Sequence, residues 1–394
     1  MAESMKIKEV LDSILKDVAR TLDIKSFELL PDLSTNFGDG FVAAFYTGVV
    51  RDELNGRMTH VAIKRNPSFA FADFSAIFKN EADIYAKLVK YFDEMQRQHK
   101  MTVVFDNTPR YFCSSLEAKN EYIAMEYLKP AGYVMVDKEK YIDEEHWKMV
   151  FQVYGRFHAL SFALKEQKPR VYQSFKDGLI DGLVSLLFIL MEPMKESFAA
   201  TLAALDPVFD EEAHNKFKKI ADDISGNYQR VSQYRGSYSC ITHGDCWSNN
   251  LLFKYSKNGK LEDVKLIDFQ LSRESSPVHD LSYIFYSSAS KEDLDKLDKY
   301  LTIYHRSFSR MARDLNCNPE SQFPLSALKE EWKEYGLFGV YMGLYLWKVK
   351  LLPKSQLLAD SETQAKLTKE LYEGEAYRTR VRNLVLHALD EGLL

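Results

Sequence analysis

Apolar and polar positions follow two different periods along the chain. In the first third, residues 41–51 (FVAAFYTGVVR) and 58–66 (MTHVAIKRN) are rich in β-branched and aromatic side chains, and an Asn-Gly pair at 55–56 lies between them. Such runs on either side of an Asn-Gly pair predict a β-hairpin. Residues 102–115 and 121–128 carry the same kind of pattern and predict two further strands.

Apolar residues at spacings of three and four predict helices in much of the remaining chain. Two of these helices lie in the first third, at residues 1–18 and 71–96. Beyond residues 129–133 (KPAGY) the helical pattern dominates, with short strand patterns only near 249–255 and 264–270. The longest helical segments there are 144–167, 179–204, 330–352 and 375–394.

This change of pattern predicts an α+β fold with two lobes. Residues 1–129 would form a small β-rich lobe, and residues 130–394 would form a large helical lobe. A chain of 394 residues is long enough for two cores of this kind.

Composition and charge exclude several functional classes. The net charge is −5 and the Lys and Arg residues are scattered, so no nucleic-acid-binding surface is expected. The most apolar run, residues 182–191, is too short to span a bilayer. The four cysteines show no metal-binding spacing, which is typical of reduced thiols in a cytoplasmic protein. The sequence does not indicate an oligomeric state.

The stretch ITHGDCWSNNLLF places His243, Asp245 and Asn250 directly before a predicted strand. A second predicted strand ends at Asp268, and an Asn-Gly pair at 258–259 predicts a hairpin between the two. The hairpin would bring Asn250 and Asp268 to the same end, where their oxygens would suit a hard cation such as Mg²⁺. Asp245 could then act as a proton acceptor near this point.

The order H-x-D-x4-N followed by D-F is typical of kinase-like phosphotransferases. In these enzymes the loop Asp is the catalytic base, and the Asn and the later Asp bind Mg²⁺ beside the phosphates of ATP. The alternative is that these Asp and Asn residues only cap turns, as they often do. Their pairing across one predicted hairpin favours the catalytic interpretation.

A kinase-like site also requires a lysine on the third strand and a carboxylate on the following helix. Lys64 in VAIKRN fits the first position, and Glu81 in FKNEADIYAKL fits the second. Alternatively, Lys64 is an ordinary surface lysine and Glu81 an ordinary exposed glutamate. Glu94 could take the role of Glu81, but it is less favourably placed. The Lys64–Glu81 pair would hold the ammonium group against the nucleotide phosphates.

Two main-chain segments of the first lobe are candidate nucleotide contacts. Gly38, Gly40 and Ala43 have G-x-G-x-x-A spacing before the second strand, although a hairpin turn alone would account for glycines there. The main chain from Glu126 to Leu128 would meet the adenine ring where the lobes join.

Two features distinguish this chain from protein kinases. Gly244 stands where protein kinases have the arginine of H-R-D, and only about a dozen residues separate Asp268 from the helical segment HDLSYIF. The chain has no D-F-G or A-P-E motif for a peptide-presenting segment. These features favour a small-molecule acceptor over a peptide.

Asp280 precedes LSYIF as a helix N-cap would, and it is expected to brace the loop.

The runs HGDCWSNNLL, IDFQ and HDLSYIFYSS together resemble the ecdysteroid kinase-like family, also called CHK kinase-like, which is related to choline kinases and aminoglycoside phosphotransferases. AIKRNP, FKNEADIY, AMEYL and GRFHALSF extend the resemblance over most of the chain. Members are abundant in insects and other arthropods. Those of known activity phosphorylate hydroxyls of steroids, notably ecdysteroids, and others are linked to the phosphorylation of xenobiotics.

The resemblance implies a role for each matching residue. The family's roles fall on Asp245 (base), Asn250 and Asp268 (metal ligands), Lys64 (phosphate contact) and Glu81 (its partner). From its kinase-like position, His243 is expected to fix the loop by hydrogen bonding rather than to transfer protons.

The acceptor site is expected between this loop and the helical lobe. Trp247 would line it or simply pack in the core, and the aromatic residues of 331–347 present the same alternative. Glycines at 336, 339 and 343 favour close packing against another helix.

The sequence as a whole predicts an ATP- and Mg²⁺-dependent kinase that phosphorylates a hydroxyl of an apolar alcohol, with a steroid or xenobiotic as the leading class. A kinase of cationic acceptors of the choline or aminoglycoside type is one alternative. A nucleotide-binding pseudokinase is another, although the retained Lys64, Asp245, Asn250 and Asp268 argue against it.

Overall fold

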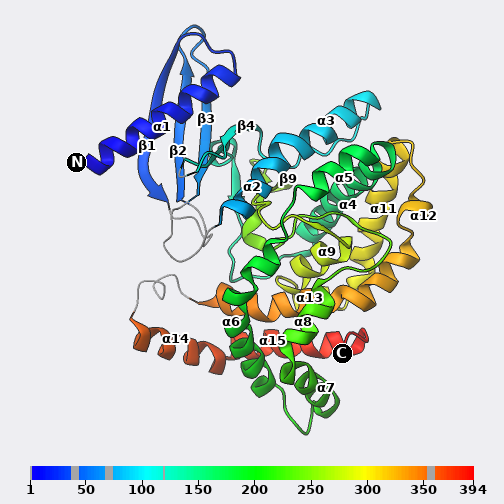
Figure 1. The fold of residues 1–394 in the computed structure, drawn as a ribbon. Helices are drawn as coiled ribbons and strands as arrows, with labels where there is room; N and C mark the ends of the chain where they lie inside the picture. The colour runs from blue at the N-terminus through cyan, green and yellow to red at the C-terminus, as the bar shows by residue number, and fades with distance from the viewer. Residues whose placement is uncertain (1, 37–43, 67–73, 119, 353–359) are drawn as a thin grey trace. The chain divides into compact units, whose positions relative to one another are not determined.

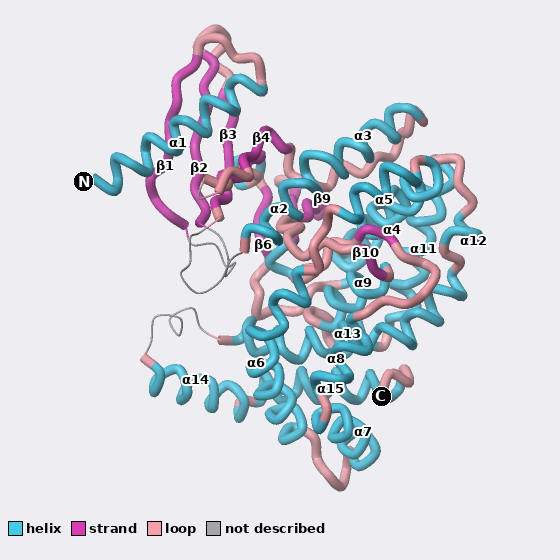
Figure 2. Tube along the Cα trace, viewed as in Figure 1, coloured by secondary structure: helices cyan, strands magenta, loops and turns pink. Residues whose placement is uncertain are grey.

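Five antiparallel strands form the main sheet of the β-rich part of the chain, as a computed structural model shows (Figures 1 and 2). The structure describes residues 2–36, 44–66, 74–118, 120–352 and 360–394. The chain divides into two compact units, here called unit 1 and unit 2. Unit 1 comprises Met1–Glu94, Asp106–Val134 and Leu251–Leu271, and unit 2 comprises Met95–Phe105, Met135–Asn250 and Ser272–Leu394.

Unit 1 holds most of the strands, and its helix α3 and strand β6 continue into unit 2. In chain order its elements are α1 (Ala2–Thr21), β1 (Phe27–Asn36), β2 (Ala44–Asp52), β3 (Met58–Arg65), α2 (Ser75–Asp83), a π-helical turn (Ile84–Leu88), α3 (Val89–Gln98), β4 (Tyr111–Ser115), β5 (Tyr122–Glu126), a 3₁₀ turn (Lys129–Ala131), β6 (Tyr133–Met135), β8 (Leu251–Tyr255) and β9 (Leu261–Leu266).

Unit 2 is mainly helical. In chain order its elements are α4 (Glu144–Gln167), α5 (Pro169–Asp177), α6 (Gly182–Ala204), α7 (Glu211–Asp222), α8 (Ile224–Ser232), β7 (Cys240–Ile241), a 3₁₀ turn (Ser248–Asn250), β10 (Glu274–Ser275), α9 (Pro277–Tyr286), α10 (Lys291–Leu294), α11 (Leu297–Asp314), α12 (Pro319–Gln322), α13 (Leu325–Leu351), α14 (Ser361–Glu373) and α15 (Glu375–Asp390).

The sheet of unit 1 has the strand order β1-β2-β3-β5-β4. The predicted β2–β3 hairpin is confirmed: Arg51 pairs with Met58, and Gly56 in the connecting turn has a φ of 75° that favours glycine. Lys64 lies on β3, paired with Phe45 of β2 on one side and Ile123 of β5 on the other. The lysine is therefore held near the centre of the sheet.

Helix α1 covers one face of this sheet, as Figure 1 shows. Its apolar positions Leu11, Leu15 and Val18 are fully buried in one cluster with sheet residues such as Val61 and Ile63. The amphipathic helix predicted for residues 1–18 is thus confirmed. Burial of such a stripe is the main source of its stability, because an isolated helix of this length is marginal in water.

The core of unit 2 is built from long helices with aromatic side chains between them. Trp147 and Phe151 of α4 pack on Phe285 of α9, with ring centroids 5.3 and 6.0 Å away, and Tyr300 of α11 joins the cluster. The predicted helix at 144–167 coincides with α4. The contacts among α4, α9 and α11 fix the helix that carries Asp280.

Several local predictions differ from the structure. The helix predicted for 71–96 contains the π-helical turn, and in the segment predicted as strand at 102–115 only Tyr111–Ser115 is extended in a ladder. The sequence analysis missed β1, which pairs with β2. Pro31 within β1 weakened its strand signal, because proline cannot donate to a ladder and is confined to positions such as edge strands.

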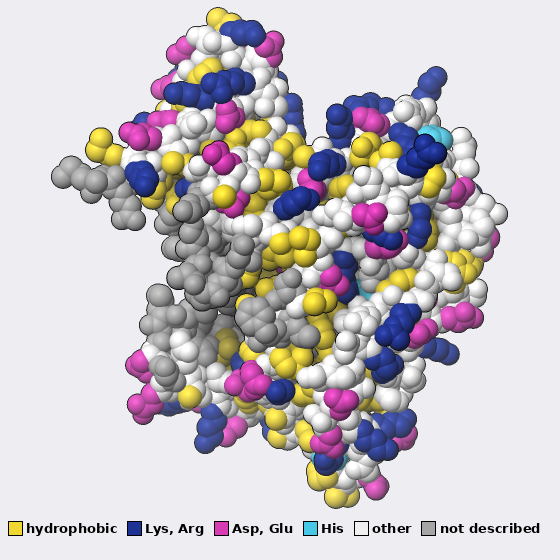
Figure 3. Space-filling view, viewed as in Figure 1, with side chains coloured by type: hydrophobic (Ala, Val, Ile, Leu, Met, Phe, Trp, Pro, Cys, Tyr) yellow, Lys and Arg dark blue, Asp and Glu magenta, His cyan; other side chains and the backbone are white. Residues whose placement is uncertain are grey.

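The α+β fold class, with a small β-rich unit and a larger helical unit, is confirmed. None of the described helices combines the length and apolar character that crossing a membrane requires. All four cysteines are free thiols. On the face drawn in Figure 3, Lys and Arg side chains are interspersed with Asp and Glu side chains over the described residues.

Helix α13 packs directly on α9 through its glycines. A Cβ on Gly339 would overlap the main-chain carbonyl of Ser282, and a Cβ on Gly343 would lie 2.6 Å from the carbonyl oxygen of Tyr286. A Cβ on Gly336 would meet side-chain atoms instead, those of Trp332 at 3.2 Å and of Leu393 at 3.5 Å. The close helix packing predicted from these glycines is confirmed.

We expect Gly339→Ala to lower the free energy of unfolding by about 2–3 kcal/mol, because the two helices must separate to admit the methyl group. Gly336→Ala is the matched control on the same helix, and its effect should stay below about 1 kcal/mol. Urea denaturation of the three proteins measures both values. Equal effects of the two substitutions would contradict the assigned packing.

Candidate active site

Lys64 lies at the centre of a buried ion-pair cluster in unit 1. Its Nζ is 2.5 Å from Oε2 of Glu81 on α2 and 2.7 Å from Oδ1 of Asp268, which follows β9. Only 12% of the Lys64 side chain and 2% of the Glu81 side chain are exposed. The predicted contact between Lys64 and Glu81 is therefore present.

The charge of Lys64 is determined by its two partners. Burial alone would lower the pKa of Lys64, but the charges of Asp268 and Glu81 outweigh burial and raise the pKa above its usual value. The ammonium group stays protonated at neutral pH. Two carboxylates and one ammonium leave a net negative charge in this cluster, which suits a cation nearby.

Asp268 has a backbone conformation that residues with side chains rarely adopt. Its φ is 68°, in the left-handed region. Aspartate enters this region more readily than most residues, and residues held there are concentrated at functional sites. The next residue, Phe269, packs edge-on against Tyr85 with ring centroids 5.5 Å apart, which anchors the segment that follows Asp268.

Glu81 lies close to the place where α2 passes into the π-helical turn. Such turns are frequent at functional sites. Tyr85 of this turn is buried, and burial together with the charges of Glu81 and Asp268 raises its pKa. Asn80 Nδ2 donates to the carbonyl of Gln270 at 3.3 Å. α2 is thereby tied to the segment that carries Asp268.

Of the two main-chain segments predicted to contact the nucleotide, only one lies among the described residues. Gly38, Gly40 and Ala43 lie outside the described residues. The N–H of Glu126 donates to the carbonyl of the residue before β4, and the next N–H donates to a carbonyl of β3. The carbonyl of Leu128 accepts hydrogen bonds from the turn that follows and from the first residue of β6. The main chain is thus fixed where adenine contact was predicted, and the contact itself stays a prediction.

The polar loop of unit 2 is held by a buried carboxylate. The N–H groups of His243 and Gly244 donate to Oδ2 and Oδ1 of Asp280, at 2.7 and 2.9 Å. His158 Nε2 on α4 lies 3.1 Å from the same Oδ2. Burial alone would raise the pKa of Asp280, but these hydrogen bonds and the neighbouring histidines lower it. The predicted bracing role of Asp280 is confirmed.

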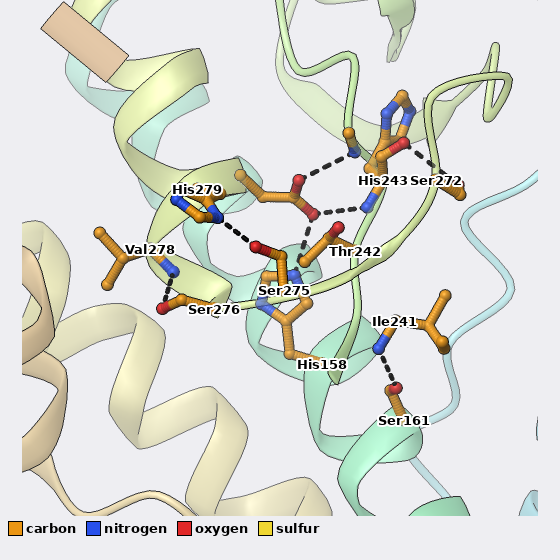
Figure 4. Close-up of polar contacts among 12 residues, drawn as sticks. His158, Ser161, Ile241, Thr242, His243, Ser272, Ser275, Ser276, Val278 and His279 are labelled. Carbon is orange, nitrogen blue, oxygen red and sulfur yellow. Dashed lines mark hydrogen bonds and ion pairs between the residues drawn. The ribbon is translucent and has the colours of Figure 1, made fainter. Parts of the chain in front are cut away.

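The predicted N-cap role of Asp280 is wrong. Helix α9 begins at Pro277, and Ser276 is its N-cap: Ser276 Oγ accepts from the N–H of Val278 at 3.1 Å, as Figure 4 shows. A serine before a proline is the usual start of a helix. Asp280 therefore lies within the first turn of α9, where its carboxylate reaches the loop.

His243 fixes the loop through its main chain and its ring. Its side chain is buried, and Nδ1 accepts from the N–H of Asp245 at 3.2 Å. Ser272 Oγ donates to the carbonyl of His243 at 3.1 Å (Figure 4). Gly244 has a φ of 85°, a conformation that an arginine at this position would adopt only with strain. These contacts agree with the loop-fixing role expected for His243.

Asp245 and Asn250 are in direct contact. Asn250 Nδ2 donates to the main-chain carbonyl of Asp245 at 2.9 Å and to its Oδ2 at 3.1 Å. The amide orientation follows from these two bonds, which use the nitrogen. The carboxamide oxygen of Asn250 is then the atom that would face a cation.

The predicted hairpin between Asn250 and Asp268 is confirmed. Leu251 of β8 pairs with Leu266 of β9, and Gly259 in the turn has a φ of 81°. Asn250 directly precedes β8 and Asp268 follows β9 by two residues, so both lie at the same end of the hairpin. Their binding of one cation stays a prediction.

Sequence analysis missed two side chains that contact this loop network. Tyr283 of α9 donates through its hydroxyl to Asp245 Oδ1 at 3.1 Å. His158 contacts Asp280 and, through Nδ1, the hydroxyl of Tyr304 at 3.0 Å. The spacing of Tyr283, three residues after Asp280, was an available signal, because such residues share a helix face.

A model of the ecdysteroid kinase-like family matches residues 51–317, well over half of the chain. The protein belongs to the ecdysteroid kinase-like family. The matched range contains Lys64, Glu81, Asp245, Asn250 and Asp268, and the resemblance inferred from the sequence motifs is confirmed.

No curated protein matches this chain. Among solved structures, the chain is similar to the choline kinase from Cryptosporidium parvum Iowa II, with 13% sequence identity, a TM-score of 0.45, and coverage of 93% of this chain and 91% of that chain.

Glu331 of α13 ties the start of α9 to the chain before β7. Its carboxylate accepts hydrogen bonds from Ser276 Oγ and from the hydroxyl of Tyr234. Burial raises the pKa of Glu331 to about 7, although these two hydrogen bonds oppose the rise. Glu331 therefore binds a proton more tightly in the folded chain than in the unfolded chain.

This difference predicts that the contribution of Glu331 to the free energy of unfolding falls as the pH rises from about 4.5 to about 7, since this side chain binds more protons in the folded state in that window. The contribution of Glu331 is at most about 3 kcal/mol. Glu331→Gln should flatten this part of the profile and be more stable relative to wild type at pH 8 than at pH 5. Urea denaturation at several pH values tests it, and an unchanged slope would contradict it.

Proposed function

We propose that the protein is an ATP-dependent kinase that transfers the γ-phosphoryl group to a hydroxyl of an apolar alcohol, with an ecdysteroid or a related steroid or xenobiotic as the acceptor. The observation that carries this proposal is the Lys64 cluster. Three residues separated by 17 and 204 positions in the chain meet there as one buried, charged group. Family membership supports the same reaction class.

The residues present fit ATP with Mg²⁺. Asp268 offers a carboxylate and Asn250 a carboxamide oxygen, which are the hard ligands that Mg²⁺ prefers, and phosphate oxygens would complete its shell. When bound, the ion would supply charge neutralisation for the phosphates. Lys64, kept charged by its partners, would bind phosphate oxygens, and Glu81 would hold the lysine in place.

Asp245 is the proposed base. Its carboxylate would accept a hydrogen bond from the acceptor hydroxyl and orient that oxygen toward the γ-phosphorus. As the new oxygen–phosphorus bond forms and the bond to the ADP leaving group breaks, the hydroxyl proton passes to Asp245. His243 would act only through the loop, because its Nδ1 is bonded to the N–H of Asp245.

The choice of an apolar alcohol as the acceptor rests on membership of the ecdysteroid kinase-like family.

Trp247 is buried, with 7% of its surface exposed, which suits packing in the core beside the loop. The aromatic residues of α13 are also mostly buried. Neither observation assigns these side chains to an acceptor site.

We expect the purified protein with Mg²⁺ to consume ATP in the presence of a steroid alcohol, and Asp245→Asn to lower kcat by about a hundredfold or more while ATP still binds. The measurement is an ATP-consumption screen over steroids, choline analogues and plant phenolics, with mass detection of the phosphorylated product.

Asp263→Asn serves as the control, because Asp263 lies on β9 and contacts Tyr133 rather than the Lys64 cluster. Turnover of choline analogues alone would replace the steroid assignment by the cationic one. Wild-type turnover by Asp245→Asn would overturn the proposed mechanism, and nucleotide binding without turnover of any acceptor would favour a pseudokinase.

A further inference from the structure

We propose that Tyr283 is a positioning residue that holds the Asp245 carboxylate in the orientation needed to receive the acceptor proton. The inference rests on the proposed role of Asp245. Tyr283 is not assigned a proton-transfer step, and it acts only through the carboxylate that it contacts.

The carboxylate of Asp245 is held at both of its oxygens. Tyr283 donates to Oδ1 at 3.1 Å, and Asn250 donates to Oδ2 at 3.1 Å. The two donors come from different elements, α9 and the 3₁₀ turn before β8. Because each oxygen accepts at least one hydrogen bond, rotation of the carboxylate about its last bond would break at least one of them.

Tyr283 is itself rigidly placed. Its side chain is 3% exposed, and its ring packs edge-on against Phe338 of α13 with centroids 6.0 Å apart. The neighbouring residue Ser282 meets Gly339 without room for a methyl group between them. Helix α13 thus packs directly against the segment of α9 that carries Tyr283.

The same face of α9 contacts the loop twice. Asp280 accepts from the loop N–H groups of His243 and Gly244, and Tyr283, one helical turn later, donates to Asp245. The first contact fixes the main chain of the loop and the second fixes its reactive side chain. α9 therefore sets both the position of Asp245 and the direction of its carboxylate.

The phenol remains a donor over the working pH range. Burial raises the pKa of Tyr283 well above its usual value, and the nearby charge of Asp245 adds to the rise. A neutral hydroxyl facing a carboxylate can act only as the donor, so the polarity of this hydrogen bond is fixed.

The direct test is Tyr283→Phe, which removes the hydroxyl and keeps the ring. We expect kcat to fall roughly ten- to hundredfold, the range for losing a hydrogen bond to a charged group, while KM for ATP and for the acceptor stays within about twofold. Rates are normalised to the fraction of protein that binds nucleotide, so a partly unfolded sample does not mimic the effect.

Tyr286→Phe is the matched control. Tyr286 lies one turn later on α9, is fully buried, and has its hydroxyl bonded to Trp332 Nε1 at 3.1 Å and to His387 instead of the loop. This variant loses a buried phenol hydroxyl from the same helix without touching Asp245. Its normalised kcat should match that of wild type.

A double-mutant cycle with Asp245→Asn separates positioning from a general structural role. If Tyr283 acts through the carboxylate, Tyr283→Phe should cause no further loss of kcat in the Asp245→Asn background. Additive losses, or a wild-type kcat for Tyr283→Phe alone, would overturn the inference. Wild-type turnover by Asp245→Asn would instead contradict the proposed function. Failure of the Tyr283 inference and failure of the proposed function are therefore distinguishable.

Discussion

The buried carboxylate of Asp280 is the contact on which the His243–Asn250 loop depends. An isolated carboxylate at 1% exposure would be strongly destabilising, and it persists only because His158 and two main-chain N–H groups compensate its charge. Those N–H groups belong to His243 and Gly244. The cost of burying the charge is thus offset by fixing a loop whose backbone would otherwise be free to move.

Unit 1 also holds a buried charge that its neighbours compensate, but in unit 1 this charge is positive. There a buried ammonium, Lys64, is compensated by two carboxylates, and Asp268 reaches it from a strained backbone conformation. In both places a buried charge is stable only when its partners are correctly placed. In unit 1, removing Lys64 would leave two carboxylates without their counter-charge, and in unit 2, removing the donors to Asp280 would leave a buried carboxylate unpaired.

Helix packing in unit 2 holds α9, the helix that carries Asp280, in place. Gly339 and Gly343 let α13 approach α9 closely, and Glu331 of α13 contacts Ser276, the N-cap of α9. α9 in turn carries Asp280 and Tyr283 on one face. Small residues on α13 thus determine the position of α9, and α9 in turn determines the position of the loop that carries Asp245.

Local patterns allowed much of this to be predicted from the sequence. The hairpins at Gly56 and Gly259 and helix α4 follow from turn residues and periodicity, which act over short distances. The contact between Lys64 and Glu81 was predicted differently, from the order of residues that a kinase-like site requires. The contact of Tyr283 with Asp245 joins residues 38 positions apart. The spacing from Asp280 placed Tyr283 on the helix face that meets the loop, but no local pattern indicated which loop residue it contacts. The N-cap of α9 was misplaced because Asp280 resembles a cap, although the Ser276-Pro277 pair carried the stronger signal.

The central claim is that Asp268 takes part in cation-dependent nucleotide binding. Isothermal titration with a non-hydrolysable ATP analogue, with and without Mg²⁺, tests it on wild type, Asp268→Asn and Glu262→Gln. Glu262 is an exposed residue of β9, the strand that precedes Asp268. The account predicts that Mg²⁺ strengthens binding by about tenfold or more in wild type and Glu262→Gln, and has little effect in Asp268→Asn. A full Mg²⁺ effect in Asp268→Asn would contradict it.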